Sequence, residues 1–309
     1  MKPLASTLLF LFVLFNHSAY GQEVSDQSVR QIDDLLYVEE SSAANDTLQR
    51  LNLVLPAEGT DFPLLIWIGG GAWSYVDRHM EMDLGRRMAA AGIAFASVGH
   101  RLSSATWKDP ALNSGVKHPA HVKDLAAASQ WLYEEASEFG YSRDKIFVGG
   151  FSSGAHLAAL VAMDPTYLNE VGLSPNIIKG IIPISGANDI LNYYEVFLNS
   201  ETRSSLAETH VKAVFGATED DLVNASPTEY VDNLSTPMLL MADEGPSIQN
   251  YTRLFEEKLA AAGYGDFEAL YIHNMSHAEL WRDLSYSEDS RYRDLIIQFI
   301  RSHVHTEQP

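Results

Sequence analysis

Six short apolar runs follow one another along the chain, and stretches with helical spacing lie between them. The runs are PLLIWI (63–68), IAFASV (93–98), KIFV (145–148), IIKGIIPIS (177–185), TPMLLM (236–241) and FEALYI (267–272). An apolar run of this length is typical of a strand that is buried on both faces of a sheet. The segment LQRLNLVLP (48–56) alternates apolar and polar positions and predicts an earlier strand.

Three longer stretches carry apolar residues at helical intervals. They are MEMDLGRRMAAAG (80–92), HVKDLAAASQWLYEEASEFG (121–140) and RYRDLIIQFIRSHV (291–304). Gly92 and Gly140 close the first two, and glycine suits the left-handed conformation that ends many helices. Strands that alternate with helices predict an α/β fold, in which helices cover both faces of a mostly parallel central sheet.

The pattern predicts one folded domain over residues 47–309. Residues 22–46 are polar and form a lead-in, in which DDLLYVEE (33–40) favours a short helix. Residues 186–235 lack strand periodicity and are long for a plain connection. We therefore expect a small helical, cap-like insertion after the strand GIIPIS.

The N-terminus has the organisation of a secretory signal peptide. Lys2 precedes the apolar segment LASTLLFLFVLF, and the small residues Ala19 and Gly21 follow it. The apolar segment is short for a membrane span, so we place a signal peptide at residues 1–21, cleaved after Gly21. A secreted or periplasmic protein without a stable membrane span is expected, and an uncleaved anchor is the alternative.

Composition narrows the partners. The 309 residues hold 41 acidic and 21 basic side chains, for a net charge of -20, and no Lys/Arg cluster. This balance argues against nucleic acid and other polyanionic partners. The chain has no cysteine, which excludes disulfides, and 46% of its residues are hydrophobic, enough for one sizeable core.

The stretch GGFSSGAH (149–156) contains the pattern G-x-S-x-G, centred on Ser152. The pattern is weak alone, but here it follows the strand KIFV and opens the helical stretch AHLAALVAM, as a nucleophile elbow does. Such a turn exposes the serine hydroxyl at the carboxyl end of the sheet. Ser153 is the rival nucleophile, although its position better suits a backbone N–H donor. The alternative is a small-residue turn without chemistry.

A glycine-rich segment, Ile68 to Trp73, directly follows a buried strand. Its glycines allow backbone N–H groups to turn toward an oxyanion, and the Ser153 N–H is expected to complete the hole. Trp73 and Tyr75 lie beside it and are candidates for substrate binding. A plain turn or a phosphate loop is the alternative, but no lysine follows as in G-x-x-x-x-G-K.

The catalytic base is expected after the last strand, where FEALYIHNMSHAEL offers His273 and His277. We favour His277, which lies in the loop beyond the strand. The pair lacks the glutamate of H-E-x-x-H, so a metal site is not predicted. Three acids are candidates for the partner of the histidine: Asp243 first, then Glu244, then Asp189.

Several segments together resemble the α/β-hydrolase superfamily, in particular its esterase branch with an HGGGW motif, which includes hormone-sensitive-lipase-like and kynurenine-formamidase-like enzymes. They are GGFSSGAHLAAL, GGGAW, VGHRLS, HPAHVKDLAAASQWL, SPTEYV and NMSHAEL, and the resemblance covers roughly residues 48–305. It implies the α/β-hydrolase fold and an oxyanion hole from Gly70, Gly71 or Ala72. Two positions depart from the family: Gly69 stands where histidine is usual, and Gly245 stands where the acid loop G-x-x-D-P has aspartate.

These residues predict a secreted serine hydrolase that cleaves a small carboxylic ester through an acyl-enzyme and needs no cofactor. Ser152 is the expected nucleophile, His277 the base, and Asp243 or one of its alternatives the acid. An arylformamidase-like amidohydrolase is an alternative, because the same residues cleave an amide. The departure at Gly245 raises a second alternative, a catalytically impaired member that acts as a binding protein.

Overall fold

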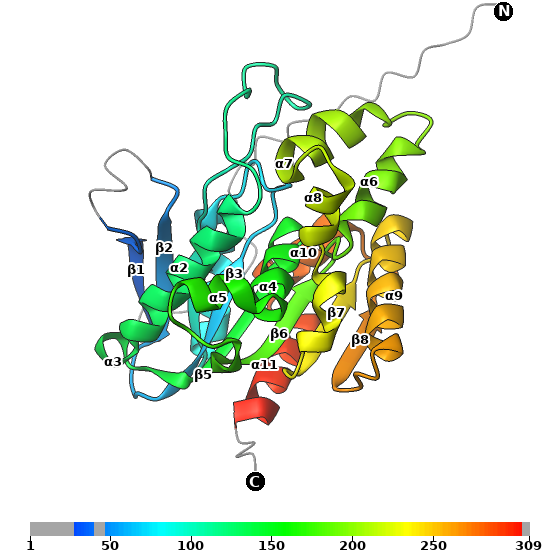
Figure 1. The fold of residues 1–309 in the computed structure, drawn as a ribbon. Helices are drawn as coiled ribbons and strands as arrows, with labels where there is room; N and C mark the ends of the chain where they lie inside the picture. Colours follow the sequence, from blue (N-terminus) through cyan, green and yellow to red (C-terminus); the bar gives the residue numbers. More distant parts are fainter. Residues whose placement is uncertain (1–27, 40–46, 305–309) are drawn as a thin grey trace, which may run out of the picture.

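The computed structural model describes residues 28–39 and 47–304. The predicted signal peptide, residues 1–21, lies outside this range. Eight strands form one sheet in the order β1-β2-β4-β3-β5-β6-β7-β8 (Figure 1). They are β1 (Val29–Leu36), β2 (Arg50–Pro56), β3 (Phe62–Ile68), β4 (Ala94–Val98), β5 (Tyr141–Phe151), β6 (Ile178–Ile184), β7 (Met238–Ala242) and β8 (Phe267–Tyr271).

The sheet is mostly parallel, which confirms the prediction. β1 pairs antiparallel with β2, and β2 pairs antiparallel with β4. All pairs from β4 to β8 are parallel. The glycine-rich segment after β3, the serine after β5 and the acid loop after β7 therefore meet at one edge, because carboxyl ends of parallel strands share an edge.

The short helix predicted at residues 33–40 is wrong. Residues 29–36 form the edge strand β1, so the sheet begins inside the stretch that the pattern assigned to a polar lead-in. The register of β1 shifts between Ile32 and Leu35, and Asp34 has a positive φ of 60°. This bulge breaks the two-residue alternation, and the two aspartates inside it hide the strand from periodicity.

Helices cover both faces of the sheet. On one face lie α2 (Ala120–Glu134), α4 (Ser153–Met163), α5 (Pro165–Glu170) and α9 (Pro246–Ala261), and on the other α1 (Met82–Ala90), α10 (His277–Tyr286) and α11 (Arg291–Val304) (Figure 1). The short α3 (Ala136–Phe139) ends at Gly140, whose φ is 83°. Gly92 has a φ of 85°, so both predicted helix stops are confirmed.

The apolar run of β3 shows why the central strands lack alternation. Leu64, Ile66 and Ile68 pack into the core on the side of α4, whereas Leu65 and Trp67 pack on the side of α1 and α10. Successive side chains of a strand point to opposite faces. Because helices cover both faces here, every position of β3 from Leu64 to Ile68 is buried.

Residues 186–235 are helical, as predicted. They form α6 (Ile190–Leu198), the π-helical η3 (Ala207–Lys212), α7 (Ala213–Phe215), α8 (Glu219–Asn224) and the 3-10 segment η4 (Pro227–Asn233). The helices α6, α7 and α8 lie together at the top of Figure 1. This insertion brings α6 to the edge of the sheet where the loops meet.

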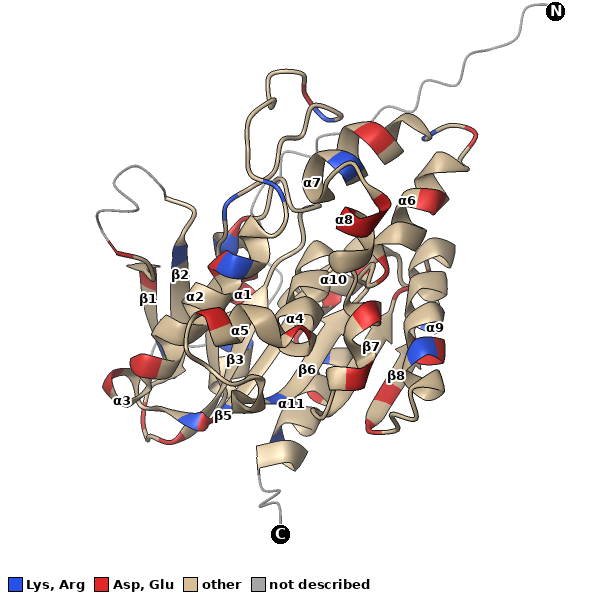
Figure 2. Cartoon of the chain, in the orientation of Figure 1, with Lys and Arg blue, Asp and Glu red and all other residues tan. Residues whose placement is uncertain are grey.

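Acidic side chains are spread over α3, α6 and α8, and the fewer basic ones are scattered among them (Figure 2). Within the described ranges, no helix is long and apolar enough to cross a membrane.

Candidate active site

Ser152 occupies the sharp turn between β5 and α4. Its φ and ψ are 55° and -119°, and its N–H donates to the Ile184 carbonyl at 2.8 Å. A positive φ is unusual for a residue other than glycine and is characteristic of functional sites. The strand–turn–helix context expected for the G-x-S-x-G pattern is therefore present, and Ser153 is the first residue of α4.

Gly150 and Gly154 flank Ser152, and neither position has room for a side chain. A Cβ atom on Gly154 would lie 2.0 Å from the Ile68 carbonyl oxygen, and one on Gly150 would lie 2.5 Å from the backbone of Gly154. Both distances are far below van der Waals contact. The glycines thus allow β3, the turn and α4 to pack backbone against backbone.

The glycine-rich segment lies directly against the serine. A Cβ on Gly70 would be 3.1 Å from the Ser152 Cβ, so this loop and the turn share one surface. Ala72 and Trp73 have φ values of 49° and 58° and turn the chain around the Gly71 carbonyl, which accepts from two later N–H groups.

Three backbone N–H groups at this surface are candidates for oxyanion donors. Those of Gly71 and Ala72 have no acceptor among the described residues. The Ser153 N–H lies in the first turn of α4, where no intrahelical acceptor exists. Together with the positive end of the helix dipole, these donors favour negative charge beside Ser152.

The structure places Asp243 beside His277. Asp243 follows β7 directly and is fully buried, and His277 is the first residue of α10. The Asp243 Oδ2 lies 2.6 Å from the His277 Nδ1. An ionised carboxylate here accepts a hydrogen bond from the Nδ1–H of His277, which keeps the proton on Nδ1 and leaves Nε2 as the nitrogen available for proton transfer.

The protonation of Asp243 follows from its surroundings. Burial raises the pKa of its carboxyl, but the hydrogen bonds from His277 and Gly245 and the charge of His277 outweigh burial and hold the pKa below its ordinary value. The Gly245 N–H donates to Oδ1 at 2.8 Å. The carboxylate therefore keeps its charge at neutral pH.

Gly245 makes room for this arrangement. A Cβ at position 245 would lie 2.8 Å from the Asp243 Oδ1. The residue that replaces the family's aspartate is thus a glycine that both donates to the carboxylate two positions earlier and leaves space for it. Asp243 contacts the histidine from the start of the loop.

The alternative residues lie elsewhere. Glu244 is exposed, and its N–H donates to the Met275 carbonyl. Asp189 caps α6 by accepting from the Asn192 N–H at 2.8 Å. His273 is exposed, in the loop before His277.

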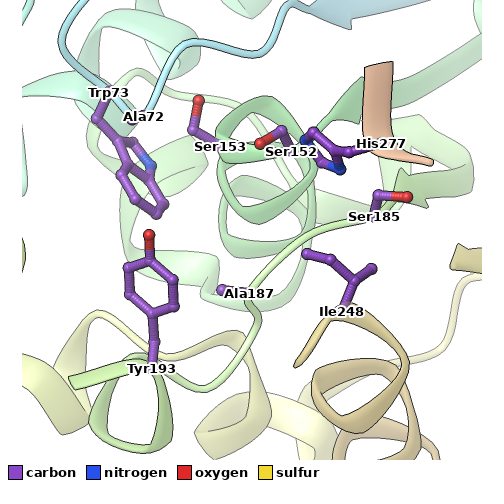
Figure 3. A pocket seen from close by; sticks show the side chains of 9 residues that line it. All are labelled: Ala72, Trp73, Ser152, Ser153, Ser185, Ala187, Tyr193, Ile248 and His277. Atoms are coloured by element: carbon purple, nitrogen blue, oxygen red, sulfur yellow. The ribbon is translucent and has the colours of Figure 1, made fainter. Parts of the chain in front are cut away.

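Two cavities lie at this site, and Ser152 and His277 line both of them. The smaller cavity, of about 230 Å³, also contacts Ala72, Trp73, Ser153, Ser185, Ala187, Tyr193 and Ile248. Figure 3 shows Tyr193 reaching from α6 toward Trp73, and Ile248 from α9 facing Ala187. The larger, of about 350 Å³, also contacts Gly70, Gly71, Tyr75, Asp77, Met80, Glu81, Phe151, Ala278 and Trp281.

Trp73 and Tyr75, the residues predicted for substrate binding, line different cavities. Trp73 is buried and lines the smaller one, and its indole N–H donates to the His156 Nδ1 at 3.2 Å. Tyr75 is exposed and lines the larger one, with the Lys108 Nζ 4.1 Å from its ring centre.

Several wall residues were not predicted from sequence. Tyr193 and Ile248 come from the insertion and from α9, where no local motif marks them. Trp281 could have been found from its spacing. It lies four residues after His277 on the same helix and therefore on the same face. Among the described residues, no group of three or more His, Cys, Asp or Glu side chains is placed to hold a metal ion.

The sequence pattern that defines the BD-FAE family matches residues 51–257. Esterase LipQ of Mycobacterium tuberculosis is 28% identical over 236 residues, which cover 72% of this chain and 51% of LipQ. Carboxylesterase NlhH of the same species is 28% identical over 173 residues, which cover 52% of this chain and 51% of NlhH. The chain thus spans about half the length of these two curated relatives.

Solved structures share the fold. Esterase B from Lactobacillus rhamnosis superposes with a TM-score of 0.72 at 19% identity, over 90% of this chain and 86% of that one. An esterase from Pyrobaculum calidifontis superposes with a TM-score of 0.66 at 23% identity, over 82% of this chain and 81% of that one. These likenesses agree with the predicted α/β-hydrolase fold.

Proposed function

The chain belongs to the BD-FAE family and has the α/β-hydrolase fold, and on that premise we propose that it is a secreted serine esterase of small carboxylic esters. The observation that carries the proposal is the 2.6 Å contact between Asp243 and His277 in cavities that Ser152 also lines. A nucleophile and a base that line the same cavities, with an acid hydrogen-bonded to the base, are the parts that acyl transfer requires. The names of the esterase relatives agree with this reaction.

The proposed reaction has two halves. His277 Nε2 takes the proton of the Ser152 hydroxyl while Oγ attacks the ester carbonyl, and the carbonyl oxygen becomes negative. His277 then gives this proton to the leaving alcohol, and the acyl group stays on Ser152. Water attacks the acyl-enzyme with the same base, so the acid is released and Ser152 is restored.

The fixed charges support this sequence of steps. The ionised Asp243 holds the Nδ1–H tautomer of His277 and stabilises the imidazolium that forms during attack. The N–H groups of Gly71, Ala72 and Ser153 stabilise the oxyanion, with Gly70 keeping the loop against Ser152. Loss of one such donor typically costs ~3 kcal/mol of transition-state stabilisation.

Labelling with a fluorophosphonate probe tests the proposal. The wild-type protein should be labelled, and Ser152→Ala should abolish labelling and ester hydrolysis. Ser153→Ala retains the Ser152 hydroxyl and should still be labelled, which separates the two serines. Ser142→Ala, at the other end of β5, is the control for a serine change in the same strand. An unlabelled wild type would favour the alternative of a catalytically impaired binding protein.

A substrate comparison separates ester from amide cleavage. Short-chain aryl and alkyl esters should be hydrolysed with a higher kcat/KM than N-formylkynurenine. A large preference for the formamide would instead support the arylformamidase-like alternative, with the same Ser152 and His277.

Export is proposed from the pattern of residues 1–21. N-terminal sequencing of the protein recovered outside the cytoplasm should begin at Gln22, after cleavage behind Gly21. A recovered chain that still begins at the first residues would contradict cleavage there.

A further inference from the structure

Glu81 is a buried carboxyl group in the wall of the larger cavity, close to the reacting residues. It ends the short 3-10 helix η1 (Arg78–Glu81) and is 2% exposed. Its Oε2 accepts from the Trp67 indole N–H at 2.8 Å, and its Oε1 accepts from the Trp281 indole N–H at 3.2 Å. The carboxyl thus joins two tryptophans from different elements.

These two tryptophans belong to the two segments that carry the chemistry. Trp67 lies near the end of β3, immediately before the glycine-rich loop with the oxyanion donors. Trp281 lies one turn after His277 on α10. Both tryptophans donate to the carboxyl group of Glu81. This carboxyl group therefore fixes the position of the glycine-rich loop relative to α10, the helix that begins at His277.

The glycine at position 69 belongs to the same arrangement. A Cβ on Gly69 would lie 2.9 Å from the Glu81 Oε1 and 3.2 Å from its Cγ and Cδ. In the esterases that this chain resembles, position 69 carries histidine. Here the Glu81 side chain occupies the space that a side chain at position 69 would need, and the residue is glycine. The Glu81 carboxyl group, from η1, thus packs against Gly69 at the start of the glycine-rich loop that holds the oxyanion donors.

The burial of Glu81 is costly and points to a role beyond packing. Removal from water raises the pKa of its carboxyl to about 7, and the nearby Asp77 adds to the rise, although both indole N–H groups oppose it. Other titratable or charged groups near this wall include Tyr286 and His277 on α10, Tyr75 on the loop, and Asp83 on α1. A leucine would fill the same space without this cost.

Resting on the proposed function, we propose that Glu81 is a positioning residue for catalysis. By accepting from Trp67 and Trp281 at once, it holds the oxyanion loop and the first turn of α10 so that the backbone donors and His277 face the same substrate carbonyl. It acts through these neighbours and takes no part in bond making.

Glu81→Gln tests this role. The amide keeps the shape but offers one acceptor and an N–H₂ group that faces an indole donor, so one of the two contacts is lost. Misplacement of catalytic groups by about 1 Å typically lowers rates by up to ~100-fold, so we expect kcat to fall about 10- to 100-fold with KM little changed. The rate of fluorophosphonate labelling should fall in parallel.

Trp281→Phe is the second variant, because it removes a single donor and leaves the carboxyl in place. Its effect and that of Glu81→Gln should be less than additive in the double variant, since both variants disrupt the same pair of hydrogen bonds at residue 81. Asp164→Asn is the matched control: Asp164 is also a buried carboxyl, but it caps α5 away from the cavities. It should leave kcat unchanged.

The outcomes separate the two proposals. A wild type that is neither labelled nor active defeats the proposed esterase function itself. An active wild type whose kcat changes less than about twofold in both Glu81→Gln and Trp281→Phe overturns the positioning role alone. A parallel fall of kcat in the Asp164→Asn control also overturns it, since the loss would then follow from any buried carboxyl.

Discussion

Ser152 carries its hydroxyl on a backbone conformation that glycine adopts more easily. A non-glycine residue at positive φ costs ~1–3 kcal/mol, and the surrounding strands and α4 must supply that energy. The same conformation exposes the serine side chain to the two cavities. The conformation that the proposed reaction needs at Ser152 is therefore one that lowers the stability of the fold.

The variant Ser152→Gly tests this trade-off between stability and activity. Glycine relieves the strain at a φ of 55°, so we expect the free energy of unfolding to rise by ~1 kcal/mol, while esterase activity is lost. Urea denaturation followed by circular dichroism measures the first effect. A variant that is less stable than wild type would show that the turn is not strained.

Asp243 is the residue whose role was least defined by sequence. Asp243→Asn keeps the size of the side chain but removes the charge that holds the Nδ1–H tautomer, so kcat should fall by up to ~10⁴-fold. Glu244→Gln should have little effect, since Glu244 is exposed. Asp189→Asn should leave kcat unchanged, because that side chain caps α6. A large loss in either of these controls with full activity in Asp243→Asn would reassign the acid.

At the scale of elements, the loop between β7 and α9 sets the position of Asp243. In Gly245→Ala the added methyl group would lie 2.8 Å from Oδ1 and should push the carboxylate away from His277. We expect kcat/KM to fall about tenfold, as for other small displacements of catalytic groups. Gly265→Ala is the control, since a Cβ there meets nothing within 4 Å. Equal activity of the two variants would contradict this account of Gly245.

Sequence patterns predicted the elements where local signals dominate. Continuous apolar runs located the central strands, and the G-x-S-x-G motif between β5 and α4 located Ser152. The strand β1 was missed because its bulge at Asp34 removes the periodicity. Asp243 could only be ranked among three acids, because the choice depends on the space that Gly245 leaves in a folded loop. Glu81 had no local signal, since its partners are 14 and 200 residues away.

At the scale of the whole molecule, the site is assembled from one edge of the sheet plus an insertion. In the proposed mechanism, loops after β3, β5 and β7 supply the donors, the nucleophile and the acid, and α10 supplies the base. The insertion contributes Tyr193, which lines the smaller cavity. Changes in residues 186–235 should therefore alter substrate choice more than the chemical step, because Ser152, His277 and Asp243 all lie outside this insertion.

The cost of keeping Glu81 ionisable should appear in the stability of the whole chain. Its pKa is about 7 when folded and ordinarily 4.5, so the folded protein binds more protons than the unfolded chain between these values. The contribution of Glu81 to the free energy of unfolding is therefore greatest below pH 4.5. It falls by ~3 kcal/mol in total as the pH rises to about 7.

Glu81→Gln removes this titration. The difference in unfolding free energy between the variant and wild type should shift in favour of glutamine by ~3 kcal/mol between pH 4.5 and pH 8. Urea unfolding of both proteins across this range measures it, and other titrating groups cancel in the comparison. A difference that stays constant with pH would mean that Glu81 is not the buried titrating group. A variant that gains stability at high pH while losing kcat would show that the carboxyl is kept for catalysis.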